Sequence, residues 1–87
     1  MYRVKITEKA LKSLKNLDKQ IARMIIAWIE KNLEGTKDPR AKGKGFSHEK
    51  KSIWRYWVGN YRILTNITDN ELIILVIEFG HRKDIYK

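Results

Sequence analysis

The sequence contains no cysteine, a single proline and no long hydrophobic run. The missing cysteines exclude disulfides, thiolate nucleophiles and cysteine-ligated zinc, and they are typical of proteins from a reducing compartment. The longest apolar run, Leu72–Ile77, is far too short to span a bilayer. No apolar stretch follows a basic start at the N-terminus, so we expect no signal peptide and a cytoplasmic protein.

Acidic residues are also scarce. Ten Asp and Glu residues face 19 Lys and Arg residues, for a formal net charge of +9 at pH 7. The excess is concentrated between Lys37 and Arg62, where eight basic residues stand against two acidic ones. Such a charge favours polyanionic partners, such as nucleic acid or acidic protein segments. A lysine-rich surface that serves only solubility is the alternative. The length, 87 residues, predicts one domain that spans residues 1–87.

The N-terminal half predicts a strand followed by a helical hairpin. Tyr2–Ile6 alternates and is rich in strand formers. Thr7 is placed to cap a first helix, and Asp18 to cap a second one that Gly35 ends as its C′ residue. The second helix carries one apolar stripe at helical spacing, made of Ile21, Ile25, Trp28, Ile29 and Leu33.

The next segment, residues 35–52, carries the only proline and three of the five glycines, without apolar periodicity. It predicts a basic loop. Its candidate contacts to a nucleic-acid backbone are Lys42, Lys44, Lys50 and Lys51. A solvated loop end is the alternative interpretation of the last two lysines.

In the C-terminal half, the pattern of residue types repeats every two residues, as in a β-strand. Ile53–Val58 and Tyr61–Thr68 are predicted strands joined by a tight turn at Gly59–Asn60. After a second turn, the nearly continuous apolar run 71–79 predicts a central strand that is buried on both faces. We therefore predict a small two-layer α+β domain of order βααβββ, with the helical hairpin packed on an antiparallel sheet of about four strands.

Alternation also predicts which side chains face away from the helices. Arg62 lies on the opposite, open face to Tyr61, Ile63, Thr65 and Ile67. Arg55 joins it there if the strand register allows. After Gly80, the chain is expected to turn out over the same face with His81, Arg82 and Tyr86. These residues, with Trp57 on the first hairpin strand, predict a cationic groove with aromatic walls, which suits single-stranded nucleic acid. Ordinary strand packing is the alternative for Trp57.

Several chemistries find no support in the sequence. The two histidines lack metal-ligand spacing, and no phosphate-binding loop, nucleophile elbow or carboxylate pair is present, so we expect no metal and no cofactor. Metal-free cleavage of RNA remains, because the substrate supplies its own 2′-hydroxyl nucleophile. Arginine suits the phosphate charge, and a proton carrier would come from His81, Tyr86 or a lysine.

The chain resembles the RelE-type toxins of the RelE/ParE superfamily. The segments "GNYRI" (59–63) and "GHRKDIY" (80–86) carry the resemblance, with looser support from "DPR…GK" (38–44). It covers nearly the whole chain. It implies a toxin that enters the ribosomal A site, cleaves mRNA there without metal, inhibits translation and is neutralised by a cognate antitoxin.

The resemblance also implies roles for individual residues. Arg62 matches the arginine that contacts the scissile phosphate, and Arg82 matches the one that stabilises charge in the transition state. Tyr86 matches the C-terminal aromatic that stacks on a base. Arg55 matches a basic residue on the first hairpin strand.

The sequence departs from the best-studied branch of the family at Trp57, where a second lysine is usual. The general base would then be another residue, and we favour His81 over Tyr86 and Lys51. Two other functions stay open: a ParE-like inhibitor of DNA gyrase without nuclease activity, and a non-catalytic basic RNA-binding module. The joint presence of Arg62, Arg82 and Tyr86 favours the nuclease.

Overall fold

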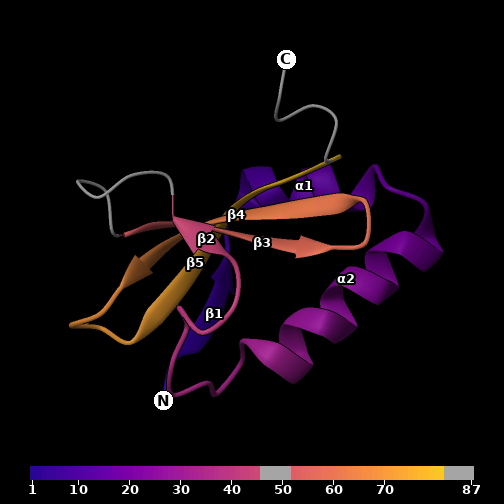
Figure 1. Ribbon diagram of the computed structural model, residues 1–87. Helices are drawn as coiled ribbons and strands as arrows, with labels where there is room; N and C mark the ends of the chain where they lie inside the picture. The colour runs from indigo at the N-terminus through magenta and orange to yellow at the C-terminus, as the bar shows by residue number, and fades with distance from the viewer. Residues whose placement is uncertain (46–51, 82–87) are drawn as a thin grey trace.

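The computed structural model describes residues 1–45 and 52–81. In the order of the chain, the elements are β1 (Arg3–Ile6), α1 (Glu8–Lys15), α2 (Lys19–Asn32), β2 (Lys44–Gly45), β3 (Ile53–Val58), β4 (Tyr61–Thr68) and β5 (Ile73–His81) (Figure 1). The two helices pack on one sheet, which confirms the predicted two-layer α+β fold.

The sheet has five strands in the order β1-β5-β4-β3-β2, rather than about four. Strands β3, β4 and β5 form the predicted antiparallel meander, but β1 pairs parallel with β5 at one edge. The additional strand β2 comes from the predicted basic loop and pairs with β3. Gly43 allows this approach: it has a φ of 82°, and a Cβ atom there would lie 2.1 Å from the Arg55 carbonyl oxygen.

The helical hairpin begins at a cap that also ties it to the sheet. The Thr7 hydroxyl accepts a hydrogen bond from the Ala10 backbone N–H (3.1 Å), which confirms the predicted cap. The same hydroxyl lies 3.3 Å from the Ile77 carbonyl oxygen and donates to it. Asp18 occupies the cap position of α2, but its side chain makes no capping hydrogen bond. Gly35 has a φ of 77° and lies two residues beyond the cap residue Leu33, not directly after it as predicted.

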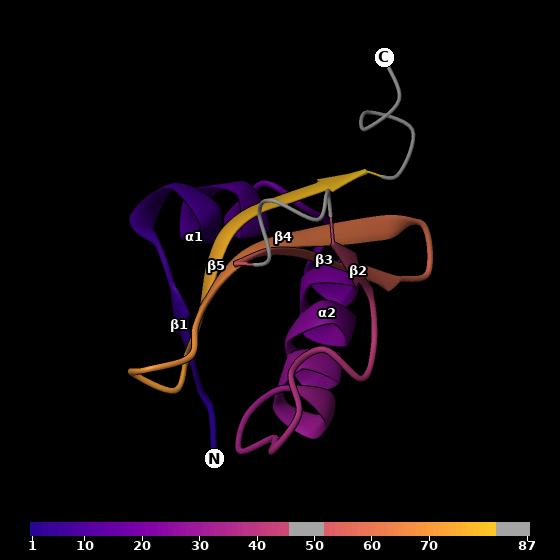
Figure 2. The ribbon, with the colours of Figure 1, turned by 60° about the vertical axis from the view of Figure 1, so that its left-hand side comes forward.

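Both helices cover the same face of the sheet, and Figure 2 shows α2 lying beneath β3 and β4. The core between the layers contains Ala10, Leu14, Ile25, Ile29, Leu33, Tyr56, Val58, Ile63, Ile67, Ile74, Val76 and Phe79. Ile63, Thr65 and Ile67 of β4 are buried on this side, as the alternation predicts. Burial of each large apolar side chain contributes roughly 1.5–3 kcal/mol to folding.

The apolar run predicted that β5 is buried on both faces, and this prediction is wrong. Ile74, Val76 and Phe79 are buried, whereas Leu75 and Ile77 are only half-buried. The spacing of the buried residues changes because β5 carries one extra residue. Thr65 pairs with Val76 and Leu64 pairs with Glu78, so Ile77 between them is a β-bulge. Every residue after Ile77 therefore faces the side opposite to the one that simple alternation predicts.

Candidate functional site

The strand register gathers several polar side chains on the sheet face that points away from α1 and α2, which we call the open face. Arg62 of β4 pairs directly with Trp57 of β3, and Arg55 pairs with Leu64. Residues paired in this way project to the same side of a sheet. Arg55, Trp57 and Arg62 therefore share the open face, as the sequence predicted if the register allowed it.

Arg62 is the most enclosed of these cations, with a side chain only 14% exposed. Its Nη2 atom lies 3.6 Å from Oε1 of Glu78 on β5. Its Nε atom is buried and has no hydrogen-bond partner among residues 1–45 and 52–81. Gly80 pairs with Arg62 and leaves room for it, since a Cβ at residue 80 would lie 3.5 Å from that Nε atom. A buried donor without a partner costs about 1–3 kcal/mol, and a catalytic or ligand-binding role is one of the explanations for such a group.

Arg55 and Trp57 extend the site along β3. Nη2 of Arg55 donates a hydrogen bond to the Gly45 carbonyl oxygen (3.2 Å), and its Cζ atom lies 5.5 Å from the centre of the Trp57 ring. The indole Nε1 of Trp57 is buried, and no partner accepts from it within the described part of the chain. Trp57 thus presents a second unused donor on the strand that pairs with Arg62.

The predicted lysines fall into different places. Lys44 is exposed and pairs with Arg55, so it lies on the open face. Lys42 instead donates its ammonium group to the Asn32 side chain at the end of α2, on the helical side of the sheet. Lys50, Lys51, Arg82 and Tyr86 lie outside the described residues.

His81 does not hang over the open face, so this predicted placement is wrong. Strand β5 continues through Gly80 and ends at His81, which pairs with Tyr61. The two rings make an edge-to-face contact, with centroids 5.2 Å apart and planes at 72°. Tyr61 lies on the helical side of the sheet, and the bulge at Ile77 puts His81 there as well. Its catalytic role stays a prediction.

The same bulge brings Glu78 to the open face, where simple alternation along β5 would not place it. Glu78 pairs with Leu64 and lies between Arg62 and Lys9 of α1, whose Nζ atom is 3.8 Å from Oε2. The sequence gives no signal of this change of phase, because residues 72–77 are all apolar. Burial in the structure shows it, since buried Ile74 and Val76 are followed by buried Phe79 instead of residue 78.

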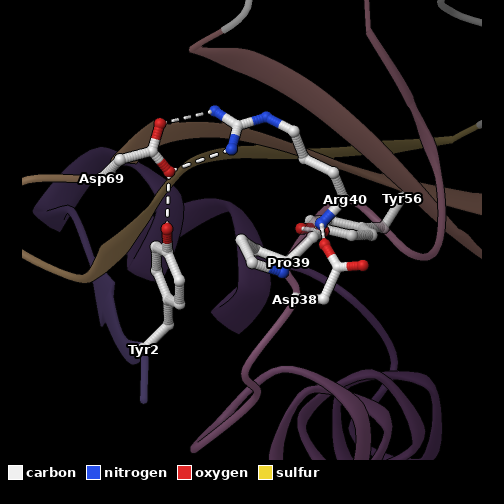
Figure 3. A network of polar contacts seen from close by, with 6 residues as sticks. All are labelled: Tyr2, Asp38, Pro39, Arg40, Tyr56 and Asp69. Atoms are coloured by element: carbon white, nitrogen blue, oxygen red, sulfur yellow. Dashed lines mark hydrogen bonds and ion pairs between the residues drawn. The ribbon is translucent and has the colours of Figure 1, made fainter.

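A second polar cluster lies at the other end of the sheet. It contains Tyr2, Arg40 and Asp69, and we call it the turn anchor (Figure 3). Arg40 binds Asp69 through two hydrogen bonds of 2.9 and 3.1 Å, and the Tyr2 hydroxyl donates to Asp69 at 2.6 Å. These contacts join the basic loop and the N-terminus to the β4–β5 turn. Sequence reasoning noted "DPR" but not the partners of its arginine.

The hydrogen bonds of the turn anchor shift the pKa values of its members. The bonds from Arg40 and then Tyr2 lower the pKa of Asp69, because they stabilise its carboxylate. The bond to Asp69 and desolvation by burial raise the pKa of Tyr2. Next to the cluster, burial raises the pKa of Tyr56, whose hydroxyl donates to the Pro39 carbonyl oxygen. These pKa shifts favour the ionised form of Asp69 and the neutral form of Tyr2.

Two further features concern metals and membranes. Among residues 1–45 and 52–81, no three His, Cys, Asp or Glu side chains lie close enough together to hold a metal ion. Neither helix in these ranges is long and apolar enough to cross a membrane.

Comparison with solved structures shows the fold in toxin–antitoxin proteins. The toxin–antitoxin complex RelBE2 from Mycobacterium tuberculosis matches with a TM-score of 0.80 at 25% identity, covering 93% of this chain and 98% of that one. The isolated RelE toxin of Escherichia coli matches with a TM-score of 0.69 at 19% identity, covering 93% and 84%. The archaeal RelE–RelB complex from Pyrococcus horikoshii matches with a TM-score of 0.71 at 23% identity, covering 93% and 94%.

Sequence comparisons agree with this result. An Escherichia coli protein described as a RelE-like toxin is 32% identical over 87 residues, which cover 98% of this chain and 90% of that protein. The family model described as the ParE toxin of the type II toxin–antitoxin system parDE matches residues 4–86. The chain therefore belongs to the RelE/ParE family of type II toxin–antitoxin toxins, and it is of the RelE type.

Proposed function

We propose that this chain is a ribosome-dependent endoribonuclease that cleaves mRNA in the ribosomal A site and so inhibits translation. The observation that carries the proposal is Arg62: an enclosed guanidinium on the open face, with a buried Nε–H that no described group accepts. A phosphate oxygen is the ligand that such a fixed cationic donor fits best. The 2′-hydroxyl of the message would attack the phosphate that Arg62 holds.

Other side chains have supporting parts in this proposal. Arg55 and Lys44, which pair with each other on β3 and β2, would contact backbone phosphates beside the scissile one. Trp57 would donate its indole N–H to the message or stack on a base. Arg82 would neutralise charge in the transition state, and Tyr86 would stack on a base.

Contacts to ribosomal RNA are proposed for the basic loop, through Lys42, Lys50 and Lys51. His81 would serve as a proton carrier only if it acts from the helical side of the sheet, next to Tyr61. The reaction needs no metal and no cofactor, since the nucleophile belongs to the substrate. It would take place in the cytoplasm, where the ribosomes are.

The partner that silences the toxin is proposed to be a cognate antitoxin. Several similar structures are complexes of a RelE toxin with a RelB antitoxin. The formal charge of +9 favours an antitoxin segment rich in acidic residues. Co-expression of the antitoxin should restore growth, and the two proteins should then purify together.

The decisive experiment combines purified toxin with message, in the presence and in the absence of ribosomes programmed with a defined A-site codon. We expect cleavage at that codon only when ribosomes are present. Cleavage of the naked message would contradict dependence on the ribosome, and no cleavage in either case would contradict the nuclease proposal.

The second candidate is a gyrase inhibitor, which the match to a family model described as the ParE toxin favours. Purified gyrase and supercoiled plasmid test it directly. Accumulation of gyrase-linked DNA breaks, together with intact mRNA in the ribosome assay, would establish this candidate and exclude the nuclease.

A further inference from the structure

Glu78 is an acidic side chain that the bulge at Ile77 brings to the open face beside Arg62. Its Oε1 atom lies 3.6 Å from Nη2 of Arg62, and its Oε2 atom lies 3.8 Å from Nζ of Lys9. The side chain is 36% exposed, so a ligand on the open face can reach it. Because it stands on a paired strand, its position is fixed by the sheet.

Both contacts of the carboxylate are longer than a hydrogen bond. No hydrogen bond to Glu78 from any described residue accompanies them, so its oxygen lone pairs are available to accept from a bound molecule. A carboxylate that served only to fix an arginine would be expected to form the short, two-pronged contact that Asp69 forms with Arg40. The loose geometry at Glu78 is suited to accepting a proton.

The neighbouring side chains cannot take that role. The guanidinium groups of Arg55 and Arg62 and the indole of Trp57 are hydrogen-bond donors with no acceptor site for a proton. His81 lies on the other side of the sheet. Of the side chains that the described strands place on the open face next to Arg62, Glu78 is the one whose functional group, a carboxylate, can act as a proton acceptor.

We propose that Glu78 is the general base of the RNA cleavage, an inference that rests on the proposed nuclease function. A Glu78 oxygen takes the proton of the 2′-hydroxyl, and the freed electron pair of O2′ forms a bond to phosphorus. The bond from phosphorus to O5′ breaks, and its electron pair stays on O5′, which gains a proton from water or a protein acid. The products are a 2′,3′-cyclic phosphate and a 5′-hydroxyl end, with Arg62 neutralising the charge on the phosphate.

Glu78 lies on the open face because of the bulge at Ile77, which the sequence did not predict. Trp57 occupies the position where the best-studied relatives have a lysine, so it leaves the open face of β3 without a proton acceptor. The extra residue in β5 brings a proton acceptor, Glu78, to the open face on the side of Arg62 away from β3. A positioned general base contributes about 10²–10⁴-fold to a reaction rate.

The test compares Glu78→Gln with Glu71→Gln, which makes the same chemical change at an exposed residue of the β4–β5 turn. Single-turnover cleavage of a ribosome-bound message should slow by about 10²–10³-fold for Glu78→Gln. It should stay within about twofold of the wild type for Glu71→Gln. Affinity for ribosomes carrying a message with a 2′-deoxy nucleotide at the cleavage site should not change. Glu78→Asp, which keeps the charge beside Arg62, should retain part of the rate and serves as the control for folding.

A message with sulfur in place of the leaving O5′ separates a base from an acid. Sulfur leaves without protonation, so a variant that lacks the acid is rescued, whereas Glu78→Gln should stay slow on it. Rescue by sulfur, wild-type rates in Glu78→Gln, or a loss of affinity equal to the loss of rate would each overturn the proposal. Cleavage by the wild type in the same assay shows that the proposed function itself stands; if the wild type does not cleave, both proposals fail.

Discussion

Within residues 1–45 and 52–81, Arg40 and Arg62 each form an ion pair with one carboxylate, yet the geometry of the two pairs is opposite. Arg40 makes a two-pronged contact of 2.9 and 3.1 Å with Asp69, which also accepts from Tyr2 (Figure 3). Arg62 is more enclosed, lies 3.6 Å from Glu78, and keeps a buried Nε–H without a described partner. Arg62, which has the more buried side chain, thus has the weaker contact with its carboxylate. Folding alone favours the first arrangement, so the second supports the proposal that Arg62 binds a phosphate.

The largest expected effect is the loss of Arg62. Arg62→Ala should lower the rate of ribosome-dependent mRNA cleavage by about 10²–10³-fold, because it removes the charge that binds the phosphate. Its free energy of unfolding should not fall, because the variant removes a buried N–H without a described partner together with one long ion pair. Single-turnover cleavage and urea unfolding measure the two quantities. Arg23→Ala, at an exposed position of α2, is the matched control and should change neither.

Substitutions at Gly80 test whether the space beside the Arg62 side chain affects the rate of cleavage. A Cβ at residue 80 would lie 3.5 Å from Nε of Arg62, an ordinary contact, so Gly80→Ala should cleave nearly as fast as the wild type. Gly80→Val adds two methyl groups that should displace the guanidinium, and we expect a loss of about tenfold in rate. Circular dichroism and melting curves show whether the fold is kept. Equal rates for the two variants would mean that Gly80 does not set the position of Arg62.

Arg40 should behave in the opposite way to Arg62. Arg40→Ala should lower the free energy of unfolding by about 1 kcal/mol, a modest value because the pair with Asp69 is partly exposed. At 25 °C, where the protein stays folded, cleavage should match the wild type. A double-mutant cycle with Asp69→Asn should show that the two losses are not additive. A large loss of cleavage in a fully folded Arg40→Ala would place this arginine in the functional site and remove the contrast.

The smallest expected effect concerns pH. Because the pKa of Asp69 is lowered from its ordinary value of 3.8, the unfolded chain binds more protons than the folded one in the range just below that value. The stability that Asp69 contributes is therefore fully present only well above that ordinary value, and it is lost as the pH falls through the lowered pKa. Urea unfolding between pH 2 and 6, in steps of about half a unit, should show a shallower acid limb for Asp69→Asn. An unchanged limb would show that the turn anchor does not shift this group.

The sequence predicted the elements whose periodicity is visible in the residue types. Strands β3 and β4 have the predicted bounds, because polar and apolar residues alternate along them on either side of a glycine turn. Strand β2 was missed, since Lys44–Gly45 is too short to show any period. The register between β3 and β4 then put Arg55 and Arg62 together, as expected.

The site was predicted less well than the fold, for a physical reason. Residues 72–77 are all apolar, so the sequence contains no alternation that could show the extra residue at Ile77. Simple counting from buried Ile74 and Val76 puts His81 on the open face and Glu78 against the helices, and both placements are reversed in the structure. Likewise, the partners of Arg40 lie in distant parts of the chain, and only the three-dimensional contact reveals them.

The hydrogen bond from Thr7 to the carbonyl of Ile77 bears on how the open face can differ between members of the family. Thr7, which caps the first helix, thus holds the extra residue Ile77 in the last strand. That extra residue decides which of residues 78–81 lie on the open face. A relative that lost one residue there would keep the same side chains but place the opposite set on its open face. The set of side chains on the open face of such a protein therefore depends on the number of residues in the last strand as well as on their identity.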